Sequence, residues 1–115
     1  HRTEILTWRP EHNPPRGLVL GYSRFSVAKA FKLWSLKGTG VVPKVANADQ
    51  ELVLSTGHAA KGAEADDVYL LPWSRIGLER FESKHPQTVR LLYVMLTRAR
   101  KRLHIPRSLR ARLPL

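Results

Sequence analysis

Short apolar runs separated by polar segments predict several buried strands in this chain. Three runs are continuous enough for strands that are buried on both faces of a parallel sheet: Gly17–Tyr22 (GLVLGY), Glu51–Ser55 (ELVLS) and Asp67–Trp73 (DVYLLPW). The segment Ile5–Trp8 (ILTW) predicts a further short strand in an otherwise proline-rich loop, and Leu103–Ile105 predicts a last one. The pattern therefore predicts a sheet with well-separated strands.

Helical periodicity lies between these runs. Ser23–Gly38 predicts a helix, with Ser23 or Ser26 as its N-cap and Gly38 as its stop, because apolar residues recur there at helical spacing. A short helix is expected around Ile76–Phe81. Thr88–Leu103 predicts the longest helix. Along one side of it, the apolar residues Leu91 and Met95 are followed at helical spacing by Arg98 and Arg102.

Strands that alternate with helices favour an α/β fold with a mostly parallel sheet flanked by helices. Gly38–Asp49 is loop-like, and Val41–Val42 within it predicts a short edge strand before Pro43. The expected organisation is an N-terminal loop or preceding fragment (1–16), one α/β domain (17–105) and a basic tail (106–115).

The net charge of the chain indicates which class of partner to expect. The chain has 115 residues, 43% of them hydrophobic and 25% charged, and its formal net charge is +11. Such a charge predicts attraction to a polyanion, most commonly nucleic acid. From Ser83 to Leu115 there are nine Lys or Arg residues and no Asp or Glu. This one-signed third predicts either a surface that faces phosphate or a solvated tail.

Several kinds of site are excluded or disfavoured. The chain has no cysteine, which excludes disulfides and thiolate metal sites, and its five histidines lack metal-ligand spacing. No apolar run approaches the roughly 20 residues of a membrane span, and the sequence contains no signal-peptide pattern. We therefore expect a cytoplasmic protein, nucleoid-associated if it is bacterial, without a membrane partner. The first residue is His rather than Met, which suggests a fragment of a longer protein.

The segment Ser55–Leu71 (STGHAAKGAEADDVYLL) carries the densest polar chemistry. It follows a predicted strand, and ligands of open parallel sheets bind at the carboxyl ends of strands. The segment offers two hydroxyls, an imidazole, a cation, a glycine that admits close backbone approach, and a carboxylate suited to a ribose hydroxyl: Ser55, Thr56, His58, Lys61, Gly62 and Glu64. Each residue alone also fits a capping or solvated role.

Two stretches resemble a known family. TGHAAKGAEADDV (Thr56–Val68) resembles motif V of UvrD/Rep-type superfamily 1 DNA helicases, T-x-H-x-(A/S)-K-G-(L)-E-(aromatic)-D-x-V. RLLYVMLTRARKRLHI (Arg90–Ile105) resembles motif VI, R-L-L-Y-V-(A/G)-x-T-R-A-(K/R)-x-x-L. The departures are Gly57 before the motif V histidine, and Ala63 and Ala65 in place of the family's leucine and aromatic residue. These smaller residues reduce the packing behind the motif.

The resemblance implies a role for each matched residue. Arg98 would be the arginine finger that reaches the γ-phosphate of ATP, and Glu64 would contact the nucleotide ribose, with Gly62 beside the cofactor. The motif V hydroxyls, histidine and lysine would lie on the single-stranded DNA track (Ser55, Thr56, His58 and Lys61). Arg102 is interpreted as facing phosphate or solvent.

The chain lacks one half of the expected catalytic apparatus. It contains no G-x-x-x-x-G-K-[ST] phosphate loop. The resemblance therefore implies the second, C-terminal RecA-like domain of an ATP-dependent DNA helicase, acting as a monomer, with Mg²⁺ held by a separate N-terminal RecA-like domain. Two alternatives stay open: a non-catalytic basic nucleic-acid-binding module with drifted motifs, and a fragment that docks on a separate ATPase half.

Overall fold

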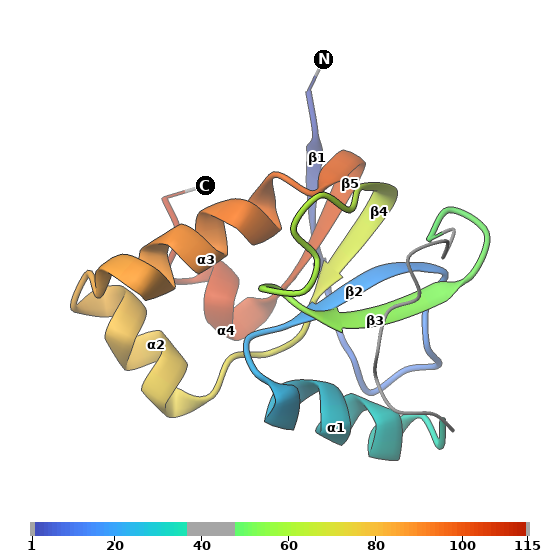
Figure 1. The fold of residues 1–115 in the computed structure, drawn as a ribbon, viewed down its shortest axis with the longest axis horizontal. Coiled ribbons are helices and arrows are strands. Elements are labelled where there is room, and N and C mark those ends of the chain that lie inside the picture. Colours follow the sequence, from blue (N-terminus) through green and yellow to red (C-terminus); the bar gives the residue numbers. More distant parts are fainter. Residues whose placement is uncertain (1, 37–47, 115) are drawn as a thin grey trace.

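The computed structural model describes residues 2–36 and 48–114. Within them the chain forms one five-stranded sheet, in which all paired strands are parallel and the order is β1-β5-β4-β2-β3 (Figure 1). The strands are bounded as follows: β1 Glu4–Trp8, β2 Gly17–Gly21, β3 Leu52–Thr56, β4 Ala65–Leu70 and β5 Ala99–Pro106. The predicted α/β class with a parallel sheet is confirmed.

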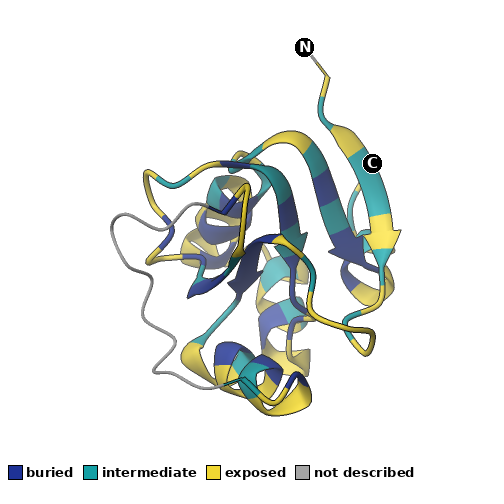
Figure 2. Cartoon of the chain, turned by 90° about the vertical axis from the view of Figure 1, so that its right-hand side faces the viewer, coloured by how far each residue is buried: buried dark blue, intermediate teal, exposed yellow. Residues whose placement is uncertain are grey.

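The helices cover the two faces of this sheet unequally. They are α1 (Arg24–Leu33), α2 (Arg75–Glu82), α3 (Pro86–Leu96) and the short α4 (Arg107–Arg110). The larger buried cluster joins β2, β4 and β5 to α3 and α4, through residues such as Leu20, Met95 and Leu109. The smaller cluster, around Val19 and Trp34, lies on the opposite face beneath α1. Figure 2 shows the buried residues concentrated along the central strands and the facing sides of the helices.

Helix α1 begins as the sequence predicts and ends earlier. The side chain of Ser23 accepts a hydrogen bond from the backbone N–H of Ser26, so Ser23 is the N-cap. After Leu33 the chain turns through Ser35, which takes the left-handed conformation at φ 52°. The backbone N–H of Ser35 donates to the carbonyl of Lys32, and the N–H of Leu36 donates to the carbonyl of Phe31, which closes the helix. The predicted stop, Gly38, lies outside the described residues, as does the strand predicted at Val41–Val42.

The helix predicted over Thr88–Leu103 is wrong in its second half. Helix α3 begins at Pro86, a residue suited to a first helical position, and ends at Leu96. Ala99–Pro106 is instead strand β5, paired with both β1 and β4. Pairing on two sides satisfies the backbone along this strand, and this tertiary gain outweighs the helical preference of its arginines and leucine.

Both flanking segments pack on the domain. The predicted strand at Ile5–Trp8 is confirmed as β1, which pairs in parallel with β5. In the segment assigned to a basic tail, Arg107–Arg110 forms α4 and Leu109 is fully buried in the larger cluster. The domain boundaries at 16/17 and 105/106 remain a prediction.

Candidate nucleotide and nucleic-acid site

The connection between β3 and β4, Gly57–Glu64, crosses the sheet. It leaves the carboxyl end of β3 and reaches the amino end of β4, and β2 lies between these two parallel strands (Figure 1). A strand of five residues such as β2 is about 16 Å long. The sequence predicted a ligand-binding turn at the carboxyl edge, but only the first half of the connection lies there.

A groove of about 650 Å³ opens at the carboxyl end of β2 and β3. Thr56 and His58 line it, as their predicted contact with a ligand requires. The hydroxyl of Thr56 accepts a hydrogen bond of 3.2 Å from the backbone N–H of Ala59, which fixes the start of the connection. The His58 side chain is exposed and therefore available to a ligand.

The groove also contains cations that the sequence reasoning missed. Arg24 contributes from the first turn of α1, and Arg80 from α2. The residues that line the groove include no Asp or Glu: Tyr22, Ser23, Arg24, Thr56, His58, Ala59, Arg80, His85, Gln87, Thr88 and Leu91. A signal for Arg24 existed in the sequence, because it follows the predicted strand Gly17–Tyr22. Arg80 and His85 are brought in by folding alone.

A chain of polar contacts fixes one wall of the groove. Arg80 Nη1 donates to the Tyr22 hydroxyl at 3.5 Å, and this hydroxyl lies 3.4 Å from Thr88 Oγ1. Thr88 Oγ1 in turn lies 3.3 Å from His85 Nδ1. This series of polar contacts links the residue after β2 to α2 and α3, so three separate elements build the wall.

The other two residues predicted on the DNA track lie away from the groove. Ser55 is fully buried, and its hydroxyl donates to the carbonyl of Thr56 at 2.9 Å. Lys61 is exposed further along the connection and does not line the groove. The structure therefore brings Thr56 and His58 together and separates them from Ser55 and Lys61.

Gly57 explains one departure from the family pattern. A Cβ at this position would lie 2.5 Å from Met95 Cε and 2.7 Å from Leu91 Cδ1 on α3. The space that a larger motif V residue would need is thus filled by motif VI side chains. Ala65 is similarly fully buried within the sheet, so the small residues are closely packed against their neighbours.

Arg98 lies in the turn between α3 and β5, not on a helical stripe. Its side chain is half-buried and donates to the carbonyl oxygens of Val94 at 3.1 Å and Ala63 at 3.4 Å, and to Thr97 Oγ1 at 3.1 Å. The first of these bonds caps the C-terminal end of α3, a favourable position for a cation. The second ties motif VI to motif V.

The predicted nucleotide-contacting residues gather around this turn. Gly62 and Glu64 flank Ala63, which accepts from Arg98, and the N–H of Ala65 donates to the Arg98 carbonyl at 3.1 Å. Gly62 has φ +88°, a left-handed conformation that favours glycine, and nothing would contact a Cβ there. Glu64 is exposed. The far end of the connection thus places a carboxylate, a glycine and an arginine close together.

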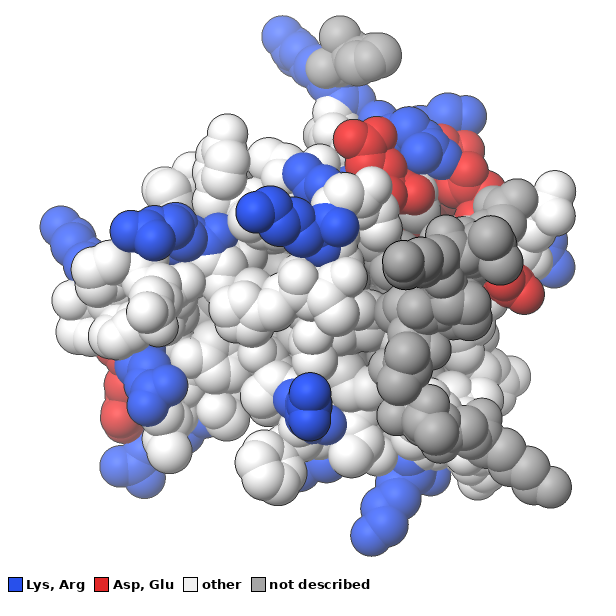
Figure 3. Space-filling view, viewed as in Figure 1, with Lys and Arg blue, Asp and Glu red and all other residues white. Residues whose placement is uncertain are grey.

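The arginines that follow Arg98 are paired with acids at the amino edge of the sheet. Arg102 donates to both carboxylate oxygens of Asp67 at 2.6 and 2.9 Å, and Arg100 bonds Asp66 at 3.0 Å and Asp49. Figure 3 shows acidic side chains gathered beside basic ones at the upper right, over the starts of β4 and β5. The interpretation of Arg102 as facing phosphate or solvent is therefore wrong, because this strand folds back onto acids from β4.

These ion pairs lower the pKa values of the two aspartates that take part in them. The hydrogen bond from Arg102 lowers the pKa of Asp67; partial burial opposes this shift, and the His104 contact at 2.9 Å adds to it. The hydrogen bond from Arg100 likewise lowers the pKa of Asp66. Both carboxylates are therefore held in the charged form.

Residues 2–36 and 48–114 contain no group of three or more His, Asp or Glu side chains arranged to hold a metal ion. No helix within these ranges has the length and apolar character needed to cross a bilayer.

Comparison with known proteins identifies the motif-bearing segment. Residues 51–105 match the family model of the UvrD-like helicase C-terminal domain. No curated protein and no solved structure matches the chain. The match runs from the start of β3 almost to the end of β5 and includes the crossing connection, α2 and α3. Three residues of the groove, Tyr22, Ser23 and Arg24, lie outside it. The predicted resemblance is therefore confirmed over residues 51–105, which carry motifs V and VI and are similar to the UvrD-like helicase C-terminal domain.

Proposed function

We propose that the chain is the second RecA-like domain of an ATP-dependent superfamily 1 DNA helicase or translocase that moves on single strands. One observation carries the proposal: a single connection, Gly57–Glu64, has its first end at an acid-free cationic groove and its second end against Arg98. Such a connection is suited to link a nucleic-acid contact to a nucleotide contact.

The groove at the carboxyl edge would hold the single strand. Arg24 and Arg80 supply charge for phosphates, the Thr56 hydroxyl supplies a polar contact, and the exposed His58 ring supplies a surface on which a base can stack. Lys61 does not line the groove and adds an exposed cation further along the same connection. Ser55 is left out of the proposed contact surface because it is fully buried.

The opposite end of the connection would contact ATP bound by an N-terminal RecA-like domain, which would also hold Mg²⁺. Arg98 uses three of its five N–H groups within the chain, and two remain for a phosphate oxygen. Its charge would stabilise the transition state of phosphoryl transfer, and Glu64 would accept a hydrogen bond from the ribose. ATP supplies the reacting phosphate; this chain supplies orientation and charge.

Movement of the strand would follow from this linkage. When two domains close on a nucleotide, Arg98 is drawn toward the phosphates. Its bond to the Ala63 carbonyl would transmit that shift along the connection to Thr56 and His58. Gly57, held against α3, would keep the connection from moving independently of motif VI.

A salt titration tests the proposed strand contact. Labelled oligothymidylate should bind the chain with an affinity that falls linearly with salt on logarithmic axes, by about 0.7 in slope per phosphate contact. Arg24→Ala with Arg80→Ala should lower the slope by about 1.4. The matched control is Arg75→Ala. Arg75 lies on α2, as Arg80 does, but it pairs with Glu79 and does not line the groove. Salt-independent binding, or an equal loss in the control, would contradict the proposal.

One observation favours a second candidate function. Arg98 is already engaged by three bonds within its own chain, as a purely structural arginine would be. A non-catalytic nucleic-acid-binding module would need nothing more. Joining the chain to an N-terminal RecA-like domain separates the two: the helicase domain should give DNA-stimulated ATP hydrolysis that depends on Arg98, and the binding module should not.

A further inference from the structure

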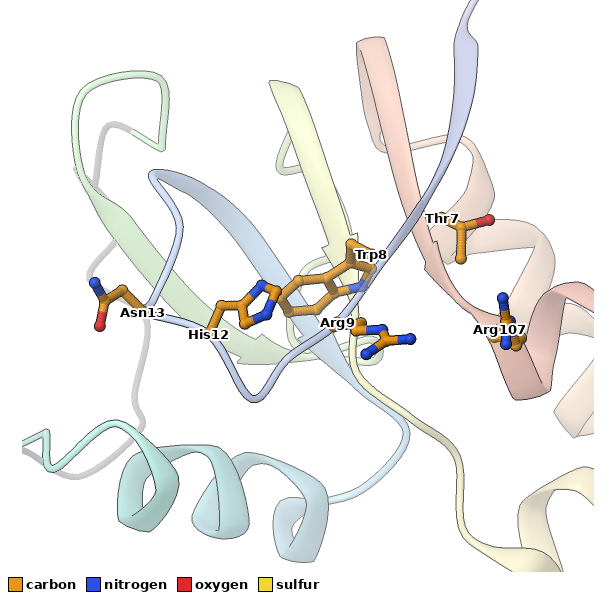
Figure 4. A pocket seen from close by; sticks show the side chains of 6 residues that line it. All are labelled: Thr7, Trp8, Arg9, His12, Asn13 and Arg107. Carbon is orange, nitrogen blue, oxygen red and sulfur yellow. The ribbon is translucent and has the colours of Figure 1, made fainter.

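A second cationic groove lies at the carboxyl ends of β1 and β5. It has a volume of about 390 Å³ and is lined by Thr7, Trp8, Arg9, His12, Asn13 and Arg107 (Figure 4). The first five residues come from the end of β1 and the loop that follows it, and Arg107 begins α4. In Figure 4 the Arg9 side chain extends from the loop toward the side on which Arg107 lies.

Indole hydrogen bonds fix the loop that forms this groove. Trp34 Nε1 donates to the carbonyl oxygens of Pro10 at 2.9 Å and His12 at 2.8 Å. Trp8 Nε1 donates to the carbonyl of Leu70 at 2.9 Å, and its ring packs at 5.0 Å from the ring of Tyr69. The groove is therefore preformed, and binding would require little ordering of its backbone.

The charges in this groove are available to a ligand. Arg9 and Arg107 are exposed, and within the described residues neither takes part in an ion pair, unlike Arg100 and Arg102. None of the six lining residues is acidic. An adjoining hollow of about 490 Å³ shares Arg9 and Arg107 and includes one exposed acid, Glu11.

We propose that this groove binds the phosphodiester backbone of a single-stranded nucleic acid. Two guanidinium groups match phosphate oxygens, the Thr7 hydroxyl and the Asn13 amide add polar contacts, and the His12 ring offers a stacking surface. The inference goes beyond the proposed function by assigning a second contact surface, and it rests on that function only for the identity of the polyanion.

The position of the groove supports a strand that continues from the first groove. The carboxyl ends of all five strands share one edge of the sheet. Pro72 and Arg107 both line the adjoining hollow. The residue after Pro72, Trp73, packs with its ring 4.7 Å from that of Tyr22, which lines the first groove. A strand following this edge would pass from His58 and Arg80 to Arg107 and Arg9.

The three tryptophans allow the two grooves to be observed separately. Trp8 lines the second groove, and Trp34 donates a hydrogen bond to the carbonyl of His12, which also lines it. Trp73 packs against Tyr22, which lines the first groove. Indole N–H signals of the ¹⁵N-labelled chain, assigned by through-bond spectra, would be followed while oligothymidylate is added. Parallel titrations with inorganic phosphate and with oligoglutamate separate a nucleic-acid site from a free-phosphate site and from an acidic-peptide site.

We expect oligothymidylate to shift the Trp8 and Trp34 signals saturably. Arg9→Ala with Arg107→Ala should remove these shifts and leave the Trp73 shift in place. The control is Arg16→Ala. Arg16 is an exposed arginine in the same β1–β2 loop, but it lines neither groove, so this variant should retain the shifts of all three indole signals. A Trp73 signal at its original position in the ligand-free double variant would show that the core is folded, because Trp73 is buried and lines neither groove.

Other outcomes decide against the inference or against the proposed function separately. A shift of Trp73 alone would overturn the second groove and leave the proposed function standing. Shifts of Trp8 and Trp34 alone would support the second groove and contradict the motif V groove as the DNA contact. Shifts caused by oligoglutamate or by phosphate, but not by oligothymidylate, would overturn the assignment to nucleic acid.

Discussion

The two ends of the Gly57–Glu64 connection lie in opposite electrostatic surroundings. At the carboxyl edge, Arg24 and Arg80 line a groove that contains no acid. At the amino edge, Arg100 and Arg102 are paired with Asp66 and Asp67, and Arg98 is bonded to backbone carbonyls and a hydroxyl. Basic residues at the carboxyl edge are suited to bind a polyanion. At the amino edge, Arg100 and Arg102 stabilise the fold through ion pairs, and Arg98 is held in place by its bonds to neighbouring backbone and hydroxyl groups.

This contrast shows why a high net charge does not by itself locate a binding surface. The third of the chain richest in arginine supplies the paired residues of β5, which are largely neutralised by acids of β4. The arginines that line the two grooves come from α1, α2 and the β1–β2 loop, and only Arg107 of α4 comes from that third. Binding is therefore expected at the carboxyl edge and catalytic assistance at the amino edge, and four predictions test this division.

The largest effect is expected for Arg98. In a polypeptide that also carries the N-terminal RecA-like domain, Arg98→Ala should lower ATP turnover by on the order of a thousandfold, with a far smaller change in nucleotide affinity. Arg98→Lys should recover little, because an ammonium group does not reproduce the planar guanidinium. Steady-state turnover and nucleotide titration are the measurements.

The control for Arg98 is Arg110→Ala, which removes an arginine of α4 that lines neither groove. Arg102 is unsuitable, because its removal would leave Asp67 without its main partner. Equal losses of turnover at Arg98 and Arg110, or robust hydrolysis by the 115-residue chain alone, would show that the finger is misassigned.

The second prediction concerns the packing of the connection on α3. Gly57→Val should reduce the free energy of unfolding by about 1–3 kcal/mol, because its side chain would overlap Met95 and Leu91. Met95→Ala is itself destabilising because Met95 is fully buried, but Gly57→Val should cost less in that background than in the unmodified chain, since space has been opened. Chemical denaturation measures both. An unchanged stability for Gly57→Val would mean that motif V does not pack on α3 as described.

A smaller effect is expected for His58. Its ring is exposed in the groove, so His58→Ala should weaken single-strand binding by roughly 1 kcal/mol. Thermal stability should stay nearly constant, because no buried contact is lost. A melting curve beside a binding titration distinguishes this outcome from a structural histidine, for which the melting temperature would fall and binding by the folded protein would not.

The smallest effect is expected at the amino edge, from Asp67. Its pKa lies below the ordinary value of 3.8, so its pairing with Arg102 stabilises the fold above that pH and is lost as pH falls through the lower folded value. Because the pair is partly exposed, its contribution is about 0.2–1 kcal/mol. Asp67→Asn should remove this contribution at neutral pH and flatten the acid limb of a stability profile. Single-strand binding should not change.

Local sequence patterns determined much of the architecture. Continuous apolar runs identified β2 and β3 within one residue at each end, and β4 with less accurate ends, because a strand buried on both faces needs such a run whatever surrounds it. Ser23 was identified as a cap because its hydroxyl acts on the backbone three residues away. Two motifs also indicated the family through residues 51–105.

Tertiary structure alone decided the remainder. The segment after Leu96 has helical periodicity, yet it forms β5 because β1 and β4 provide backbone partners and Asp67 provides a partner for Arg102. The order of strands made the supposed turn into a crossing connection, which separates His58 from Glu64 by the length of a strand. Strand order and ion pairing depend on residues far apart in the chain, so local periodicity carries no information about them.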